Sequence, residues 1–231
     1  MVEERSMSEV KLIDIKETIF AENVVSAKTV RDRLSEHGVF MLNLMASPGA
    51  GKTSLILKTI DILSDKYRMA VIEGDIESTI DSEKISAKGI PAVQLRTGGA
   101  CHLDATMVGA ALDMLDLSNL DIIIVENIGN LVCPASFDLG ARKNVLITSV
   151  PEGDDKVLKY PIMFSACEVL IVNKIDYLPD PGFDIEALKT RVSNLNPSMT
   201  VLELSCRNDD GIEAWTDWLK HQVNDVKLSV Q

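Results

Sequence analysis

The sequence contains few cysteines, few histidines and no long apolar run, and each shortage excludes a class of protein. The four cysteines, spread from Cys101 to Cys206, are too sparse for the disulfide framework of a small secreted domain. No stretch approaches the roughly 20 apolar residues that a membrane-spanning helix needs. The charged N-terminal residues lack the apolar segment of a signal peptide. We therefore expect a protein of the cytoplasm with no membrane partner.

Basic residues are scarce relative to acidic ones. The chain has 23 Lys and Arg against 35 Asp and Glu, which gives a formal net charge of −12. Binding along a nucleic-acid backbone requires clustered Lys and Arg, so we expect no nucleic-acid partner. A nucleotide site remains possible, because backbone N–H groups and one or two cations are enough to bind a phosphate group.

Apolar runs of strand length alternate along the chain with segments of helical periodicity. The strand-like runs cover residues 39–45, 69–74, 92–96, 122–126, 145–150, 169–174 and 201–205. The helix-like segments between and after them cover residues 51–65, 102–116, 184–195 and 211–226. This alternation predicts an α/β fold with a mainly parallel, seven-stranded sheet flanked by helices. A helical pattern over residues 8–36 ends at Gly38, so we expect an N-terminal helical segment over 1–38 packed on a domain over 39–231.

The stretch MASPGAGKTSLILKT follows the first predicted strand and begins a helix, which is the setting of a phosphate-binding loop. Glycines in such a loop let backbone N–H groups face a phosphate, Lys52 can bridge the outer phosphates, and the Thr53 hydroxyl can bind Mg²⁺. Ala46 stands where the usual pattern has its first glycine. The residues expected to bind the nucleotide here are Gly49, Ala50, Gly51, Lys52, Thr53 and Ser54.

A second nucleotide motif, NKID, comes at the end of the strand-like run VLIVN. The Asp176 carboxylate can accept hydrogen bonds from guanine N1–H and the 2-amino group together, and adenine offers no such pair of donors. Lys174 would lie along the base, and Asn173 would brace the loop. Ser205 and Cys206, in a later loop, stand where backbone atoms would meet the base oxygen. The motif predicts GTP and GDP as the nucleotides.

Two acidic residues at predicted strand ends are candidates for a magnesium site. Asp75 ends the second strand-like run, and Glu126 ends the fourth, with Gly129 three residues later. Because Mg²⁺ prefers oxygen ligands, we expect Thr53, Asp75 and Glu126 to bind it, and Lys52, Asp75 and Glu126 to act in catalysis. Asp75 has an alternative role as the N-cap of the next helix. No residue stands out as the one that orients an attacking water, so we expect slow intrinsic GTP hydrolysis.

Cys101 and His102 are adjacent, and Cys133 comes four residues after Gly129. Both segments follow strands at the sheet edge that carries the phosphate loop, so the three side chains can converge there. Two thiolates and an imidazole suit Zn²⁺ or Ni²⁺, and an ion with four ligands would need one more from water, a second chain or a partner. Inert buried cysteines and a Cys–His nucleophile are the alternatives. Cys167 has no neighbouring histidine and is interpreted as structural.

The motifs SPGAGKT, TGGACHLDA, ENIGNLVCPASFDLG, EGDDK and NKID together resemble the HypB family, the nickel-insertion GTPases of [NiFe]-hydrogenase maturation. The resemblance runs from about residue 10 to the end of the chain. It implies a P-loop GTPase fold of the SIMIBI class, with Cys101, His102 and Cys133 binding nickel or zinc near a dimer interface. It also implies a homodimer favoured by GTP and metal, the zinc-containing accessory protein HypA as a partner, and the hydrogenase large subunit as the destination of the nickel.

Two features separate this chain from its relatives. No cysteine motif or histidine-rich stretch precedes Cys101, so we expect no further site for nickel storage. The urease-maturation GTPase UreG is similar but has Cys-Pro-His, whereas Cys133-Pro134 is followed here by Ala135, which favours hydrogenase over urease. A nickel GTPase of urease maturation, a P-loop nucleotide kinase with structural cysteines and a non-catalytic zinc-binding adaptor remain the alternatives.

The short stretch between Gly129 and Cys133 suggests a link between the two predicted sites. GTP with Mg²⁺ would order the loop after Glu126 and hold Cys133 in one position, and hydrolysis would let it move. Nickel affinity and dimerisation would then depend on the nucleotide, and this dependence must be mutual.

Overall fold

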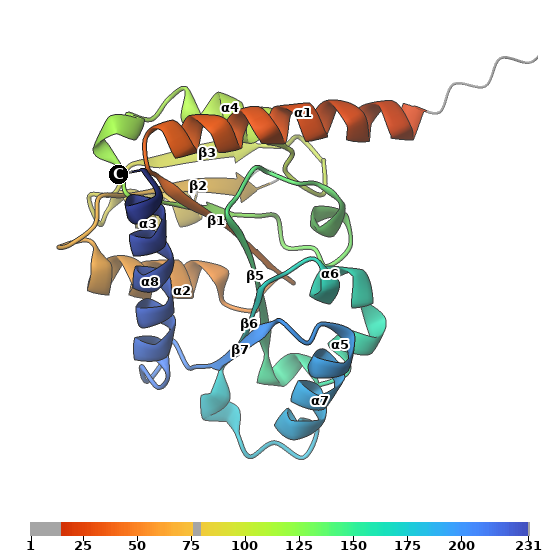
Figure 1. The fold of residues 1–231 in the computed structure, drawn as a ribbon. Coiled ribbons are helices and arrows are strands. Elements are labelled where there is room, and N and C mark those ends of the chain that lie inside the picture. The colour runs from red at the N-terminus through yellow and green to blue at the C-terminus, as the bar shows by residue number, and fades with distance from the viewer. Residues whose placement is uncertain (1–14, 76–79, 231) are drawn as a thin grey trace, which may run out of the picture.

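The computed structural model describes residues 15–75 and 80–230, which form a seven-stranded parallel sheet covered by helices on both faces (Figure 1). The strand order is β3-β2-β4-β1-β5-β6-β7, and every neighbouring pair is parallel. The strands are β1 (Phe40–Ala46), β2 (Met69–Asp75), β3 (Ala92–Arg96), β4 (Ile122–Glu126), β5 (Lys143–Ser149), β6 (Val169–Asn173) and β7 (Thr200–Glu203). The predicted α/β fold is confirmed.

Helices cover each face of this sheet. The α-helices are α1 (Ile15–Glu36), α2 (Lys52–Leu63), α3 (Ile80–Ser86), α4 (Ala105–Leu112), α5 (Lys156–Lys159), α6 (Pro161–Ser165), α7 (Ile185–Leu195) and α8 (Ile212–Val230). One core cluster joins α2, α3 and α8 to the face of β1 that carries Leu42 and Leu44. Two further clusters, under α1 with α4 and under α5 to α7, cover the opposite face. Strands that are apolar on both faces fit this three-layer arrangement.

Strand β1 lies at the centre of the sheet and positions the nucleotide loop. All seven of its residues are buried, and it pairs with β4 on one side and β5 on the other. The chain continues from β1 to β2 and β3 on one side and to β5, β6 and β7 on the other. In open parallel sheets, ligands bind at the carboxyl ends of the strands where the order reverses in this way.

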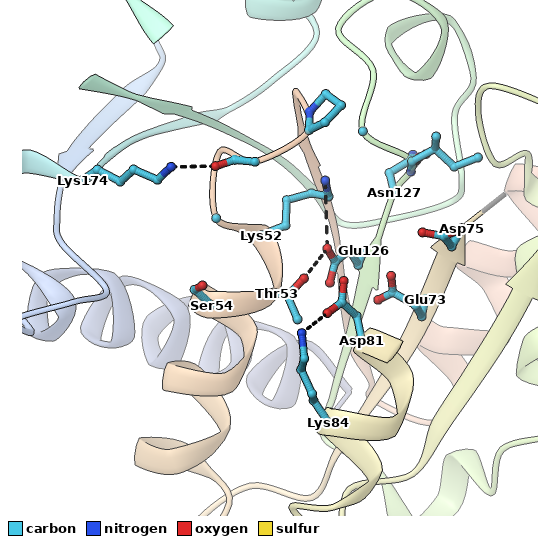
Figure 2. Close-up of a pocket in the computed structure, with 16 residues that line it drawn as sticks. Lys52, Thr53, Ser54, Glu73, Asp75, Asp81, Lys84, Glu126, Asn127 and Lys174 are labelled. Atoms are coloured by element: carbon cyan, nitrogen blue, oxygen red, sulfur yellow. Dashed lines mark hydrogen bonds and ion pairs between the residues drawn. The ribbon is translucent and has the colours of Figure 1, made fainter. Parts of the chain in front are cut away.

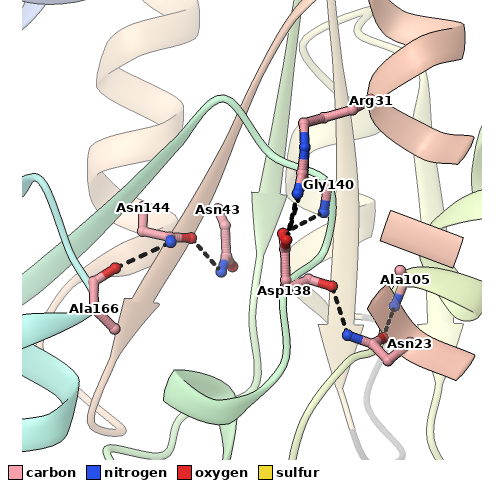
Figure 3. Close-up of polar contacts among 8 residues, drawn as sticks. All are labelled: Asn23, Arg31, Asn43, Ala105, Asp138, Gly140, Asn144 and Ala166. Atoms are coloured by element: carbon pink, nitrogen blue, oxygen red, sulfur yellow. Dashed lines mark hydrogen bonds and ion pairs between the residues drawn. The ribbon is translucent and has the colours of Figure 1, made fainter. Parts of the chain in front are cut away.

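A row of asparagine side chains interrupts the apolar core between the α1–α4 cluster and the α5–α7 cluster. The Asn43 side chain donates a hydrogen bond to Asn144 Oδ1 at 3.0 Å, and Asn144 donates to the carbonyl of Ala166 at 3.1 Å (Figure 3). At the other end of the row, Asn127 Nδ2 donates to Asn43 Oδ1 at 3.0 Å. Asn43 and Asn127 are buried and hydrogen-bonded within this row, so the row fixes the position of Asn127 beside the nucleotide cavity.

Several helix boundaries differ from those predicted. Helix α4 covers 105–112 instead of 102–116, because the Asp104 side chain caps it by accepting from the Met107 N–H at 2.8 Å. Residues 101–104 therefore belong to a loop. The predicted helix over residues 8–36 is α1 from Ile15 onward, and residues 8–14 lie outside the described residues. Its glycine end is confirmed, since Gly38 has a φ of 64°. Helices α5 and α6 were not predicted, and α3 was considered only as the helix that Asp75 would cap in its alternative role.

None of the helices within residues 15–75 and 80–230 combines the length and apolar composition that a membrane crossing needs. The division of the chain at residues 38 and 39 stays a prediction. Within the structure, α1 packs along α4 and contributes Val30 and Leu34 to the same core cluster as the sheet.

Candidate functional site

The loop between β1 and α2 has the backbone shape of a phosphate-binding loop. Gly49 and Gly51 adopt left-handed φ angles of 78° and 107°. A Cβ atom on Gly51 would lie 2.3 Å from Asn173 Nδ2, so only glycine fits there. Among the described residues, no side chain caps the N-terminus of α2, which leaves its backbone N–H groups directed at a cavity of about 590 Å³. The loop and cavity together fit a phosphate group.

The segment after β6 is bound directly to this loop. Asn173 Nδ2 donates to the Ala50 carbonyl at 2.8 Å. Figure 2 shows the second contact, in which Lys174 Nζ donates to the Gly49 carbonyl at 2.7 Å. Lys174 itself has a φ of 62°, and its N–H donates to Asn173 Oδ1 at 2.7 Å. The two nucleotide motifs, more than a hundred residues apart in sequence, thus form one hydrogen-bonded unit.

A second cavity of about 220 Å³ lies between the NKID segment and the loop after β7. Asp176 lines it, with a side chain 12% exposed, and its Oδ1 accepts a hydrogen bond of 2.6 Å from the Ser205 hydroxyl. The Cys206 N–H donates to Asn173 Oδ1 at 3.4 Å. Burial raises the pKa of the Cys206 thiol to about 11, so this thiol stays protonated. Ser205 and Cys206 therefore hold Asp176, which is expected to bind the guanine edge, and Asn173, which is expected to brace the loop.

The EGDDK segment after β5 braces the start of the phosphate loop. The Glu152 carboxylate accepts hydrogen bonds from the Ser47 hydroxyl and, at 2.8 Å, from the Ser149 hydroxyl. Lys156 lies 3.4 Å from the same carboxylate. These contacts connect the loops that follow the neighbouring strands β1 and β5.

Glu126 occupies the centre of the nucleotide cavity wall (Figure 2). Its Oε1 accepts a 3.0 Å hydrogen bond from the Thr53 hydroxyl and lies 4.0 Å from Lys52 Nζ. Its Oε2 is buried and has no hydrogen-bond partner among the described residues. Burial raises the pKa of Glu126, against the opposing effect of the Lys52 ammonium. A buried carboxylate oxygen without a partner, beside a threonine hydroxyl, suits a divalent cation.

Two acidic residues that the sequence analysis did not single out lie beside Glu126. Glu73, Asp81 and Glu126 each offer a carboxylate oxygen, and the three oxygens lie within 4.8 Å of one another. Glu73 faces Glu126 across paired strands, and its own Oε2 lacks a partner among the described residues. Burial and the neighbouring Glu126 carboxylate raise the pKa of Glu73 to about 10. A charged residue inside a strand that is apolar on both faces was the signal that could have identified Glu73.

Asp75, which the sequence analysis assigned to Mg²⁺, ends β2 and lines the same cavity, half-buried. It is not one of the three residues in the carboxylate cluster. Residues 76–79, which lie between Asp75 and α3 in the sequence, are outside the described residues. Its predicted roles as a magnesium ligand and as a helix N-cap both stay predictions.

The structure brings Cys101, His102 and Cys133 together at the same edge of the sheet. Their ligand atoms lie within 4.8 Å of one another. Cys101 Sγ is 2.7 Å from Cys133 Sγ and 3.8 Å from His102 Nδ1, and neither cysteine is in a disulfide. Cys101 is exposed, whereas His102 and Cys133 are half-buried. Three soft ligands on two surface loops thus make a candidate metal site that is open to solvent.

Burial and hydrogen bonding set the protonation of this thiol and imidazole cluster. The hydrogen bond with Cys133 raises the pKa of the Cys101 thiol. Burial lowers the pKa of His102, which favours the neutral imidazole that metals bind. Cys167 lies apart, only 2% exposed in the α5–α7 cluster, and burial raises its pKa. It has the surroundings of a structural cysteine.

Hydrogen bonds join the thiol cluster to the wall of the nucleotide cavity. Asn127, which follows Glu126 and lines the cavity, accepts a hydrogen bond of 3.4 Å from the Leu103 N–H through its Oδ1. Asn130 Nδ2 donates to the Cys101 carbonyl at 3.1 Å. The segment that runs from Glu126 to Cys133 is therefore attached to the Cys101 loop at two points.

Comparison with known proteins shows the family to which this chain belongs. Residues 40–203 match the family model described as CobW/HypB/UreG, nucleotide-binding domain. The hydrogenase maturation factor HypB of Azotobacter vinelandii is 44% identical over 216 residues, which cover 94% of this chain and 71% of that protein. The chain belongs to the HypB family.

Two solved HypB structures have the same fold as this chain. HypB from Helicobacter pylori in complex with nickel aligns with a TM-score of 0.84 and 36% identity, covering 88% of this chain and 96% of that one. HypB from Archaeoglobus fulgidus aligns with a TM-score of 0.83 and 36% identity, covering 88% of this chain and 99% of that one. Membership of the HypB family makes this chain a nucleotide-binding protein related to hydrogenase maturation factors.

Proposed function

We propose that this chain is a GTP-hydrolysing metallochaperone that delivers nickel during [NiFe]-hydrogenase maturation. The observation that carries the proposal is the position of two ligand clusters at one edge of the sheet, one of carboxylates and one of thiols and imidazole. The hydrogen bonds of Asn127 and Asn130 connect the two. Membership of the HypB family supports the same conclusion.

The nucleotide half of the proposal assigns GTP and Mg²⁺ to the larger cavity. Asp176 binds the guanine edge, and Lys52 contacts the outer phosphates together with the loop backbone. Thr53, Asp75 and Glu126 hold Mg²⁺, which neutralises charge on the transferred phosphoryl group. The partnerless oxygen of Glu126 supports this assignment. Hydrolysis to GDP and phosphate is slow, because nothing in the motifs supplies a residue that orients water.

The metal half of the proposal assigns Ni²⁺, the cargo, to Cys101, His102 and Cys133, which also suit Zn²⁺. Three ligands leave a four-coordinate ion incomplete, so water, a second chain or a partner supplies the fourth. A homodimer formed with GTP and metal, the accessory protein HypA and the hydrogenase large subunit are the proposed partners. Function in the cytoplasm keeps both thiols reduced.

The segment that links the two halves provides the proposed coupling. A Cβ atom on Gly129 would lie 3.0 Å from Pro48 Cγ, so this segment runs against the phosphate loop. A change at the γ-phosphate that shifts Glu126 would shift Asn127 and Asn130 and, through them, the backbone at Leu103 and Cys101. Nickel affinity then depends on the bound nucleotide, and nucleotide affinity depends on nickel.

Measuring Ni²⁺ affinity in the GDP-bound and GTP-analogue-bound protein tests this coupling. We expect affinities that differ by about fivefold or more, the usual range of coupling free energies. Cys133→Ala should remove most of the binding, and Cys167→Ala, the matched control, should retain it. Equal affinities in both nucleotide states would contradict the coupling, and Ni²⁺ binding unchanged by Cys133→Ala would contradict the metal site.

Three further measurements separate the alternative functions. Loss of GTP turnover in Lys52→Ala, beside an active parent, would exclude a non-catalytic zinc adaptor. Transfer of phosphate to an added acceptor instead of water would favour a nucleotide kinase. Expression in cells that lack their own HypB, with hydrogenase and urease activities measured in parallel, decides which nickel enzyme is served. We expect recovery of hydrogenase activity.

A further inference from the structure

Helix α1 supplies none of the three proposed metal ligands, yet it contacts both segments that carry them. Figure 3 shows Asn23 and Arg31, from α1, directed at Ala105 and Asp138. Ala105 begins α4 three residues after His102, and Asp138 comes five residues after Cys133. The contacts fall into two groups, one polar and one aromatic.

The polar contact is a bridge made by one buried side chain. Asn23, only 6% exposed, accepts a hydrogen bond from the Ala105 N–H through Oδ1 at 2.9 Å. Its Nδ2 donates to the Asp138 carbonyl, also at 2.9 Å. Asn23 thereby satisfies one backbone group of each ligand-bearing segment. Without it, a buried donor and a backbone acceptor would both lose a partner.

The backbone of the Cys133 segment also lies directly against α1. Gly140 has a φ of 79°, and a Cβ atom on it would lie 2.6 Å from the Ala27 carbonyl oxygen. Arg31 contacts the Asp138 carboxylate with both Nη atoms, one of them at 3.0 Å. That ion pair is exposed and contributes little by itself. The close backbone approach and the Asn23 bridge therefore determine where this segment lies.

The aromatic contact runs from α1 to the histidine ligand. The His102 ring is stacked on Phe137, with ring centroids 3.8 Å apart and planes 19° apart. Phe137 in turn contacts Phe20 of α1, with centroids 5.1 Å apart. Ring stacking restricts the rotation of the imidazole about its side-chain bonds. The direction in which His102 presents its ring nitrogens is thus set by Phe137.

We propose that α1 positions the Cys101–His102–Cys133 site, with Asn23 and Phe137 as positioning residues that act through the ligands. This inference rests on the proposed metal site. Residues that orient metal ligands without touching the ion commonly change metal affinity by about 10- to 100-fold. A displacement of α1 would reach the site along both routes, through the Asn23 bridge and through the aromatic stack.

The test compares Phe137→Leu and Asn23→Ala with Leu34→Ala in the full chain. Leu34 is also a buried α1 residue of the α1–α4 core cluster, but it lies about three helical turns beyond Asn23, so its variant controls for a loosened helix. Ni²⁺ affinity is measured by competition with a chelator, and the thiolate-to-nickel charge-transfer absorption reports the ligand geometry. GTP turnover and thermal unfolding are measured in parallel.

We expect Phe137→Leu and Asn23→Ala each to lower Ni²⁺ affinity by about tenfold and to shift the charge-transfer band, with GTP turnover unchanged. Leu34→Ala should lower the unfolding temperature and leave affinity and spectrum as in the parent. Parent-like affinity and spectrum in both positioning variants, or an equal loss in Leu34→Ala, would overturn the inference. A parent chain that binds no Ni²⁺, or a Cys133→Ala variant that binds it normally, would instead overturn the proposed function.

Discussion

Strand β4 has an acidic residue at each end, and the two residues stand in opposite surroundings. Asp121, directly before the strand, accepts hydrogen bonds from the Arg68 backbone and guanidinium at 2.8 to 3.1 Å and lies 2.9 Å from Lys227 Nζ. Glu126, at the carboxyl end, has one oxygen with no partner among the described residues. The hydrogen bond from Arg68 lowers the pKa of Asp121, whereas burial raises the pKa of Glu126.

This difference separates carboxylates that stabilise the fold from carboxylates kept for a ligand. A neutralised carboxylate contributes to stability, but a buried carboxylate without a partner costs free energy that a structural role does not explain. In this sheet the paired carboxylate lies at the amino edge and the partnerless ones at the carboxyl edge, where Glu73 joins Glu126. The predictions below test this contrast.

The largest effect is expected at the carboxyl edge. Glu126→Gln should lower GTP turnover by about 100-fold or more, because the amide keeps an acceptor for Thr53 but loses the negative charge that holds the cation. The unfolding temperature should stay unchanged or rise, since a buried charge is removed. Steady-state phosphate release and thermal unfolding without nucleotide measure the two quantities.

Glu168→Gln is the matched control for this substitution. Glu168 precedes β6 at the amino edge, is exposed and accepts a hydrogen bond from the Asn144 N–H at 2.7 Å. Its variant should hydrolyse GTP as the parent does. Near-normal turnover in Glu126→Gln, or a large loss of stability in that variant, would remove the distinction between the two edges.

At the edge of the sheet where the strands begin, Asp121→Asn should lower stability and leave GTP turnover unchanged, the opposite of Glu126→Gln. Hydrogen bonds to charged groups are each worth about 1.5–3 kcal/mol, so the variant should lose about 2 kcal/mol of unfolding free energy at pH 7 with normal GTP turnover. The folded pKa of Asp121 lies below the value of about 3.9 in an unfolded chain. Its contribution is therefore complete above pH 4 and is lost as the pH falls further.

Urea unfolding of the parent and Asp121→Asn at pH 7 and pH 3 measures this contribution. The difference between the two proteins should shrink at the lower pH. A difference that is the same at both pH values would show that the charge of Asp121 does not stabilise the fold.

The sequence was sufficient to predict those structural features that depend on residues close to one another in the chain. The strands are runs that are apolar on both faces, and the phosphate loop follows from Gly49, Gly51 and the helix after them. The convergence of Cys101 with Cys133 could be expected because both segments follow strands at one edge of a parallel sheet. These are local patterns combined with one rule of topology.

Features that depend on pairing between distant segments were not predictable. Glu73 becomes part of the site only because β2 pairs with β4 in the register that sets it opposite Glu126. Asn23 and Phe137 come from segments more than a hundred residues apart, and no motif in either one indicates that Asn23 binds the Ala105 and Asp138 backbone or that Phe137 stacks on His102. Strand order and the docking of α1 had to be known first.

A pH-dependent change in stability is expected from Glu73→Gln. The pKa of Glu73 is about 10 in the folded chain, against about 4.3 in an unfolded one. Between these values the folded state holds a proton that the unfolded state has lost, so the stability contributed by Glu73 falls as the pH rises. Gln has no such proton. The variant should match the parent near pH 4 and become increasingly more stable than the parent as the pH rises to 8.

Denaturant midpoints between pH 4 and pH 9, without nucleotide or Mg²⁺, measure this divergence. The control is Glu186→Gln, because Glu186 is exposed on α7 and pairs only with the surface Lys189 among the described residues. Its difference from the parent should not vary with pH. A Glu73→Gln variant that is less stable than the parent at pH 8 would show that Glu73 is ionised in the folded chain and stabilised there by a positively charged partner.

The smallest change in stability is expected from Asp61→Asn. This variant tests whether burial or the distance between the charged atoms determines how much an ion pair stabilises the fold. Lys88 Nζ lies 2.6 Å from Asp61, closer than the 3.0 Å between Arg68 Nη2 and Asp121, but the two side chains are 43% and 46% exposed. Exposed pairs contribute about 0.2–1 kcal/mol, and an acidic residue in the last turn of α2 opposes the helix dipole, so the net change should stay within about 0.5 kcal/mol. Urea unfolding at low and high salt measures it. If Asp61→Asn lost as much unfolding free energy as Asp121→Asn, the distance between the charged atoms, and not their burial, would determine how much an ion pair stabilises the fold. Burial would then not explain the contrast between the two ends of β4.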